Sequence, residues 1–445
     1  NNKGTEDNRV RKLDYSIQIS KLFYERFIKN EEISLFSPHD VPGLYDAFGT
    51  ESFDDLYTSY ESDGSVPRKT IGAQELFLDI LKERAETGRL YIMNIDHCNS
   101  HSSFLDKVEM SNLCQEITLP TKPLEHIDDP NGEIALCILS AVNVGKIRDL
   151  DDLKVLCDLA VRSLDELIDF QNYPINAAEI ATKARRSLGI GFIGLAHYLA
   201  KNGHDYNDPE AWQLVHNLTE AFQYYLISAT VDLAEEKGAC EYSGRTKYGN
   251  GILPIDTYKH DVDEIVPNEL HYDWEDLRLR VKKHGVRNST LSAQMPSESS
   301  SVVSNATNGI EPPRGYLSIK KSKKGPLKQI VPQYATLKNN YTLLWDMGSN
   351  RGYINIVAVM QKFFDQAISG NWSYNPLQYP DNEVPISVMA QDLLTTYKYG
   401  WKTSYYQNTY DFKTDEVDET DKESLENLIA QLENAEEEEC ESCKI

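Results

Sequence analysis

Residues 73–95, AQELFLDILKERAETGRLYIMNI, contain a helix signal followed directly by a strand signal. Apolar residues recur at helical spacing through residues 73–86, and Gly88 is a residue that commonly ends a helix. The run Leu90-Tyr91-Ile92-Met93-Asn94-Ile95 is almost wholly apolar and predicts a buried strand. The segment therefore predicts a helix that packs against a strand, which is the repeating unit of α/β proteins.

The same alternation continues along the chain. We expect further strands at 134–144, 290–295 and 401–407, and helices at 151–170, 222–236, from 299 onward and at 386–399. Gly238 and Gly400 follow two of these helices as end signals. The pattern predicts the α/β class with a largely parallel sheet covered by helices.

Length and composition restrict the class of protein. A chain of 445 residues exceeds the roughly 250–300 at which one core stops growing, so we expect two units or one large α/β barrel. No apolar run approaches the ~18 residues of a membrane helix, and the polar start is not a signal peptide, which favours a cytoplasmic protein. The net charge of −25 argues against nucleic acid as a partner. Seven cysteines are too few for a disulfide-stapled secreted scaffold.

The composition changes after Phe412, so we divide the chain into a folded part, 1–412, and a flexible acidic tail, 413–445. Twelve acidic and two basic residues lie between Lys413 and Glu439. The tail ends in Cys440 and Cys443, a spacing that suits a reversible disulfide or half of a zinc site. Because the tail contains no histidine and no other cysteine, a thiol shuttle is favoured.

The run Ser111-Asn112-Leu113-Cys114-Gln115-Glu116 brings three reactive residue types together. If the segment is extended, Asn112, Cys114 and Glu116 project from one face. Cysteine supplies a nucleophile or a radical, glutamate a base and asparagine a neutral hydrogen-bonding group. The alternative is a buried cysteine between two polar surface residues.

The other cysteines have less context. Cys137 lies in an apolar run and is by default a packing residue, unless it faces Cys114. We assign Cys157 and Cys240 to packing on helices. His97, Cys98 and His101 could supply three metal ligands, but residues directly after a strand more often form a polar network in a loop, so we predict no metal site.

Two further segments have possible roles. Hydroxyl groups and free backbone N–H groups at a strand-to-helix turn can bind phosphate. The alternative is a serine-rich helix cap; the residues concerned are Ser297, Glu298, Ser299, Ser300 and Ser301. Tyr405 and Tyr406 could pass an electron and a proton between adjacent phenols, although on a strand ordinary packing would bury one ring and expose the other.

Together, and in this order, these features resemble the large subunit of class I ribonucleotide reductases. The resemblance runs from Gly4 to the carboxyl end. The stretches that match are Gly4–Arg11, Leu35–Leu44, Asn112–Glu116, Leu188–Gly191, Asn305–Gly315 and Tyr405–Thr409. It implies part of a ten-stranded α/β barrel with the catalytic cysteine on a central finger loop.

The resemblance also implies roles for these residues in the reduction of ribonucleoside diphosphates. Cys114 would become the thiyl radical that removes a hydrogen from the ribose, with Glu116 as the base and Asn112 holding the hydroxyls. Cys137 would be one of the two reducing thiols. Ser297 to Ser301 would bind the diphosphate, Tyr405 and Tyr406 would carry the oxidising equivalent, and Cys440 and Cys443 would re-reduce the active-site disulfide.

The implied partners are a small subunit that holds a tyrosyl radical and a di-iron centre, and a thioredoxin or glutaredoxin. We expect this chain itself to bind no cofactor. It starts almost at the Gly4 stretch, so we expect one half of a split or truncated subunit whose amino-terminal partner carries the second reducing cysteine and the ATP or dNTP effector sites.

The sequence departs from the family pattern in two further places. Only two residues separate Cys440 and Cys443, where relatives have four, which leaves the external reductant open. Ser299 stands where relatives often have threonine, and both offer a hydroxyl group. The rival interpretations are a zinc-binding or thioredoxin-like redox protein, and a non-catalytic paralogue that docks through its acidic tail.

Overall fold

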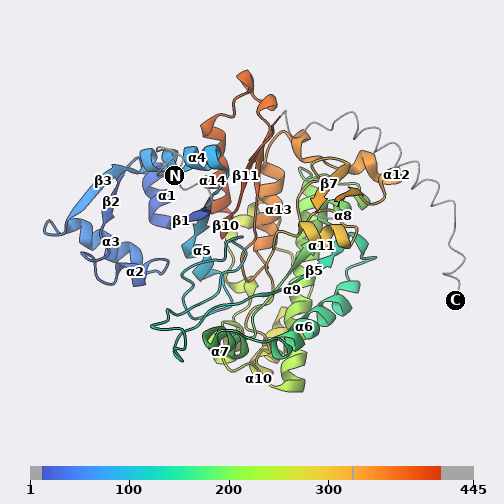
Figure 1. Cartoon of the computed structure of the whole chain (residues 1–445), viewed down its shortest axis with the longest axis horizontal. Coiled ribbons are helices and arrows are strands. Elements are labelled where there is room, and N and C mark those ends of the chain that lie inside the picture. The colour runs from blue at the N-terminus through green and yellow to red at the C-terminus, as the bar shows by residue number, and fades with distance from the viewer. Residues whose placement is uncertain (1–12, 323–324, 412–445) are drawn as a thin grey trace, which may run out of the picture.

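The computed structural model describes residues 13–322 and 325–411, in which helices and strands alternate along the chain (Figure 1). The α-helices are α1 (Lys21–Lys29), α2 (Leu44–Ala47), α3 (Phe53–Ser62), α4 (Ala73–Thr87), α5 (Ile95–Ser100), α6 (Asp152–Phe170), α7 (Asn176–Arg185), α8 (Leu195–Lys201), α9 (Pro209–Lys237), α10 (Trp274–His284), α11 (Glu298–Val303), α12 (Tyr334–Leu337), α13 (Arg351–Gln361) and α14 (Ile386–Lys398). The strands are β1 (Tyr15–Ile19), β2 (Glu32–Phe36), β3 (Arg68–Gly72), β4 (Leu90–Asn94), β5 (Ile138–Asn143), β6 (Leu188–Ile193), β7 (Leu317–Ser322), β8 (Gly325–Ile330), β9 (Trp372–Tyr374), β10 (Thr403–Ser404) and β11 (Gln407–Thr409). This content confirms the α/β class.

The prediction of a largely parallel sheet is wrong for the described residues, where the strands form small sheets of two or three. β1 pairs with β4 in parallel, as β5 does with β6 and β9 with β11. The other pairings are antiparallel. β2 and β3, with α2 and α3, form a projection at one side of the molecule that has its own apolar cluster around Phe53 and Tyr57 (Figure 1).

Residues 290–295 are extended but form only isolated bridges, to Ile190 and Ile368, instead of the predicted strand. Side chains take the hydrogen bonds that a sheet ladder would use. The Asp365 carboxylate accepts from the N–H groups of Leu291 and Ser292, at 2.8 and 2.9 Å. The amide of Gln294 bonds both backbone groups of Phe192. Polar side chains therefore replace part of the ladder here.

The core is built around α13, β4 and β6, which are buried on every side. The ten residues Gly352–Gln361 of α13 are all buried, and so is every residue of β4 and β6. α9 runs through the middle of the molecule, starts with Pro209 in its first turn and ends at Gly238 (Figure 1). The predicted helix 222–236 is thus the second half of a longer one.

Other boundaries shift by smaller amounts. The helices predicted at 73–86, 151–170 and 386–399 are confirmed as α4, α6 and α14. The strand predicted at 134–144 is only β5, so Cys137 precedes it. The strand predicted at 401–407 divides into β10 and β11, with Tyr405 and Tyr406 between them. Among the described helices, none has both the length and the apolar character needed to cross a membrane.

Candidate active site

Residues 112–116 form a turn, so the predicted extended segment is wrong. The N–H of Gln115 donates to the carbonyl of Asn112 at 3.2 Å, and Gln115 has a φ of +69°. The left-handed conformation is uncommon outside glycine and here closes the turn. Asn112 binds on both sides of the turn, since its side-chain oxygen accepts from the N–H of Ile117 at 3.0 Å. The turn, and not strand alternation, arranges Asn112, Cys114 and Glu116.

Glu116 is a buried carboxyl group, 2% exposed. The hydroxyl of Ser369 lies within hydrogen-bond distance of two acceptors, the carbonyl oxygen of Cys114 at 2.5 Å and Glu116 Oε2 at 3.2 Å. Burial raises the pKa of Glu116, while hydrogen bonds from Asn112 and Ser369 oppose the rise. A carboxyl group with a raised pKa in a partly dry site suits proton transfer near neutral pH.

Cys114 is half-buried, and its sulfur is in contact with a phenol. The hydroxyl of Tyr405 donates to Cys114 Sγ at 3.5 Å. The rings of Tyr405 and Tyr406 lie 4.2 Å apart between centroids, which is the adjacency that a relay needs, although Tyr405 is buried and Tyr406 half-buried. Arg84, which is fully buried, donates to the carbonyl of Tyr405 at 2.7 Å and fixes the backbone there. The two rings and the sulfur therefore form a continuous series of contacts.

Burial favours the protonated form of both thiols of the site. Burial raises the pKa of Cys114, and the charge of Glu116 raises it further against the hydrogen bond from Tyr405. Burial also raises the pKa of Cys137, again with a contribution from Glu116. A nucleophilic cysteine needs a lowered pKa, whereas a protonated thiol can give or receive a hydrogen atom.

Cys137 packs against the apolar cluster of Met93 and Ala293, as the packing interpretation predicts, but a polar group also reaches it. The side-chain amide of Gln366 donates to Cys137 Sγ at 3.9 Å and to the carbonyl of Leu188 at 2.8 Å. Gly189 makes room for the sulfur, because a Cβ at this position would lie 2.6 Å from it. In the Leu188–Gly191 stretch, the backbone at Gly189 therefore packs closely against the Cys137 sulfur.

A cavity of about 420 Å³ lies beside Ser369 and Tyr405, which contact Glu116 and Cys114, although the two thiols and Glu116 do not themselves line it. Its walls include Ser369, Tyr405 and Tyr406, as well as Ser297 and Glu298 at the start of α11. Ser299, Ser300 and Ser301 do not line it. Ser297 does not cap α11 through its side chain, since its hydroxyl donates to the carbonyl of Met295. The cavity thus extends from the predicted phosphate-binding residues Ser297 and Glu298 to the predicted electron-transfer residues Tyr405 and Tyr406.

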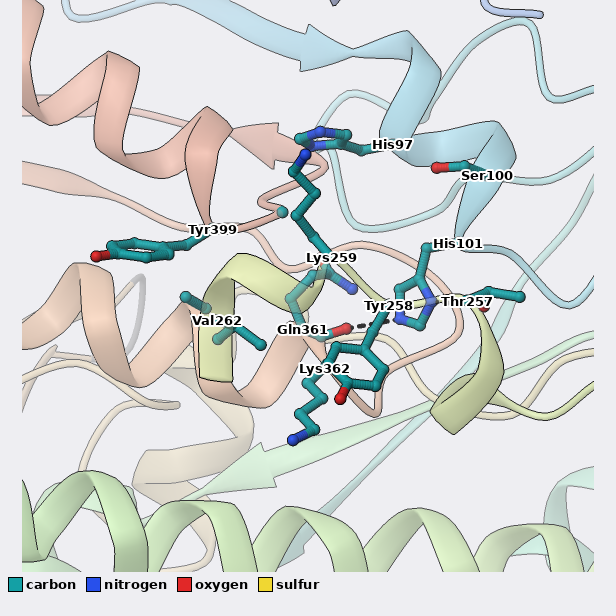
Figure 2. Close-up of a pocket in the computed structure, with 12 residues that line it drawn as sticks. His97, Ser100, His101, Thr257, Tyr258, Lys259, Val262, Gln361, Lys362 and Tyr399 are labelled. Carbon is teal, nitrogen blue, oxygen red and sulfur yellow. Dashed lines mark hydrogen bonds between the residues drawn. The ribbon is translucent and has the colours of Figure 1, made fainter. Parts of the chain in front are cut away.

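His97 and Cys98 lie on α5 and His101 directly follows it, so these residues form a bonded polar cluster at a helix and not in a loop. His97 Nδ1 is 3.0 Å from the carbonyl of Trp401, and Cys98 donates to the carbonyl of Lys402 at 3.7 Å. Both ring nitrogens of His101 are bonded, Nε2 to the carbonyl of Gln361 at 2.8 Å (Figure 2). Among the residues that the structure describes, no group of three or more potential ligands could hold a metal ion.

Lys402 lies beside this cluster and is fully buried. Its ammonium group donates to the carbonyls of Phe364, Asp365 and Gln366, at 2.9–3.2 Å. Burial lowers the pKa of Lys402 to about 7. Residues 364–366 thus connect the cluster to the site, because they accept from Lys402 and because Gln366 also bonds Cys137.

Sequence reasoning missed the segment Phe363–Asn371, which contacts every predicted catalytic residue except Asn112. The N–H of Ala367 donates to the carbonyl of Glu116 at 3.0 Å, and the N–H of Tyr405 donates to the carbonyl of Gly370 at 2.8 Å. Asn371 bonds both Glu311 and the N–H of Tyr406. One signal was available: Asp365, Gln366 and Ser369 are polar residues within an apolar run. Buried polar residues of this kind need partners.

The remaining predicted residues have no part in the site, or lie outside the described residues. Cys157 is buried in α6, as predicted. Cys240 is also buried but lies beyond the end of α9, so its assignment to a helix is wrong. Cys440 and Cys443 fall outside the described residues.

Comparison with known proteins gives one consistent result. The ribonucleotide reductase barrel-domain model matches residues 1–407. The ribonucleoside-diphosphate reductase subunit alpha of Haemophilus influenzae is 58% identical over 93% of this chain, and that of Buchnera aphidicola is 52% identical over 99%. The Escherichia coli relative, ribonucleoside-diphosphate reductase 1 subunit alpha, is 54% identical over 94%. These matches cover 56–57% of the length of each relative. The chain belongs to the ribonucleotide reductase barrel-domain family.

Proposed function

We propose that this chain is the catalytic part of the large subunit of a ribonucleoside-diphosphate reductase and acts through a radical on Cys114. The single observation that carries the proposal is the contact between Tyr405 and Cys114 Sγ, at 3.5 Å, with the Tyr406 ring 4.2 Å from that of Tyr405 between centroids. A phenol in contact with a protonated thiol provides a route by which an oxidising equivalent can remove the hydrogen atom of that thiol.

The reaction then proceeds in balanced steps. The Cys114 radical removes a hydrogen atom from the 3′ carbon of the ribose, while Glu116 takes the proton of the 3′ hydroxyl and Asn112 holds the hydroxyls. One of the two reducing thiols, Cys137 and a second thiol, protonates the 2′ hydroxyl, which leaves as water. The pair then gives a hydrogen atom to the 2′ carbon and one electron to the 3′ ketone, so that it has supplied two electrons and two protons and becomes a disulfide, while Glu116 returns its proton to the 3′ oxygen. Cys114 finally returns its hydrogen atom to the 3′ carbon, which restores the radical.

The cavity beside Ser369 suits a nucleotide in this role. Hydroxyl groups and the N–H groups near the start of α11 would bind the diphosphate in the region of Ser297 to Ser301. Ser297 and Glu298 form part of the cavity wall, which supports this end as the phosphate end. Cys440 and Cys443, on the predicted tail 413–445, would reduce the disulfide again with electrons from a thioredoxin or glutaredoxin.

The proposal includes partners that the chain would need. A small subunit with a tyrosyl radical and a di-iron centre would supply the oxidising equivalent through Tyr406 and Tyr405. An amino-terminal polypeptide would supply the second reducing thiol and the effector sites and, with residues 1–412, complete the ten-stranded barrel with Cys114 on its finger loop. Cytoplasmic localisation would place the thiols in a reducing compartment.

The test is reconstitution of the reaction. The chain is mixed with candidate amino-terminal and radical-bearing subunits, a ribonucleoside diphosphate and dithiothreitol, and deoxyribonucleoside diphosphate is measured. Tyr405→Phe keeps the ring but removes the hydroxyl that reaches Cys114, so product should fall below detection. Tyr173→Phe, which removes a half-buried phenol hydroxyl bonded at 2.7 Å to the carbonyl of Ile168, is the matched control and should keep activity. Full activity of Tyr405→Phe would overturn the proposal.

A further inference from the structure

Ser369 holds a position that no other described side chain shares, because one hydroxyl group contacts two of the predicted catalytic residues. Its Oγ lies 3.2 Å from Glu116 Oε2 and also bonds the carbonyl of Cys114. The side chain is 6% exposed and lines the 420 Å³ cavity. It therefore stands between the carboxylate, the turn that carries the thiol, and the space for the substrate.

We infer that Ser369 is a positioning residue that fixes Glu116 and Cys114 relative to each other and keeps Glu116 ionised; this inference rests on the function proposed above. A hydroxyl can donate only one hydrogen, so Ser369 bonds the Glu116 carboxylate or the Cys114 carbonyl at any one moment. Donation to the carboxylate stabilises its charged form and offsets part of the effect of burial. Donation to the carbonyl holds the turn when Glu116 is protonated.

The backbone around Ser369 is held without this hydroxyl. The N–H of Ser369 donates to the carbonyl of Gln294 at 2.9 Å, and the N–H of Ala367 donates to the carbonyl of Glu116 at 3.0 Å. These bonds remain when the side chain is shortened to alanine. The hydroxyl is therefore not needed to keep the segment in place, and its removal should act on the two catalytic residues.

The first measurement is the titration of Glu116, which needs no turnover. In protein labelled with ¹³C-glutamate, Glu116→Gln identifies the signal by its loss. Ser369→Ala should raise the midpoint by about one pH unit, the size expected from the loss of one hydrogen bond to a charged group. Ser369→Thr should restore it. Ser289→Ala is the matched control, because Ser289 is buried and its hydroxyl bonds only that of Ser187, at 3.3 Å.

The second measurement is the pH profile of the reconstituted enzyme. Glu116 acts as a base only when ionised, so a raised pKa moves the acidic limb of the profile to higher pH. On that limb, the rate of Ser369→Ala should fall about tenfold for a rise of one pH unit in the titration midpoint. The loss should shrink toward high pH, where Glu116 is ionised in both proteins. A structural defect would instead lower the rate equally at every pH.

The outcomes separate the positioning role from the proposed function. If the wild-type assembly forms no deoxynucleotide but Ser369→Ala moves the Glu116 titration, the proposed function fails and the positioning role stands. If the wild type turns over and Ser369→Ala leaves the titration midpoint and the pH profile unchanged, the inference is overturned.

Discussion

Two regions of this molecule combine cysteine with ionisable side chains, yet their chemistry differs. Around His97, Cys98 and His101, both nitrogens of His101 and the cysteine thiol are bonded to neighbours in the core. Around Cys114, Glu116 and Cys137, the groups are reached from a 420 Å³ cavity through Ser369 and Tyr405, which line it and contact Glu116 and Cys114. The first region looks more like a metal site in the sequence, and the second is the one that can react.

The difference teaches that residue type alone does not identify a reactive group. A histidine with two satisfied nitrogens and a thiol hidden in the core stabilise the fold. A half-buried thiol that touches a phenol can exchange a hydrogen atom with it, and here that phenol lines a cavity. The contact with a phenol at a cavity separates the second region from the first.

The largest expected effect tests this contrast directly with paired cysteine variants. Cys114→Ser replaces the sulfur by an oxygen whose hydrogen is much harder to remove, so deoxynucleotide formation by the reconstituted enzyme should fall by at least about a thousandfold. Cys98→Ser alters a buried thiol of the other region and should stay within about twofold per folded molecule. Equal losses in the two variants would remove the contrast.

A smaller effect is expected where the two regions are connected. Lys402→Met removes three buried hydrogen bonds, and although the Gln361 amide still donates to the carbonyls of Phe364 and Gln366, the loss should lower the free energy of unfolding by roughly 3 kcal/mol in denaturant titration. Lys201→Met is the control, since Lys201 is an exposed residue that donates to the carbonyls of Gly145 and Ile147. It should cost less than about 1 kcal/mol.

The same variant has a pH signature. The pKa of Lys402 is about 7 in the folded chain against 10.5 for a free lysine, so between these values the unfolded state binds more protons. The stability that the wild type gains from this residue therefore rises with pH across that window. The difference between wild type and Lys402→Met should widen from pH 7 upward, and a difference that narrows would contradict a buried, neutralised lysine.

The last prediction is that zinc does not bind at His97, Cys98 and His101. Zinc is added to a Cys440→Ser, Cys443→Ser variant, so that the tail cannot bind it, and bound metal is measured after dialysis. Because His97, Cys98 and His101 already bond the protein, no stoichiometric zinc and no change in melting temperature are expected. One zinc per chain, lost in His101→Ala, would make the first region a metal site.

Much of the fold follows from local patterns. α4, α6 and α14 were predictable because each has a continuous helical pattern, and a glycine follows the ends of α4 and α14. The strand at 290–295 was not, because Asp365, more than 70 residues away, takes the N–H groups that a sheet would have used. Local sequence cannot show which distant side chain will compete for a backbone group.

The site was predictable in its residues but not in its geometry. Cys114, Glu116, Cys137 and Tyr405 come together as their residue types suggest. The reason is a turn closed by Gln115, and no alternation of a strand. Ser369 and Gln366 were missed because their importance depends on which distant residues they touch, and those contacts come from the folded chain.

The burial of the Lys402 amine has a practical consequence for following motion in this protein. An amine with no exposed surface, all of whose hydrogens are shared with carbonyls, cannot be reached by acylating reagents while the neighbouring backbone stays closed. The carbonyls that shield it belong to residues 364–366, next to Ser369. The rate at which Lys402 becomes acylated would therefore report how often the backbone around residues 364–366 opens.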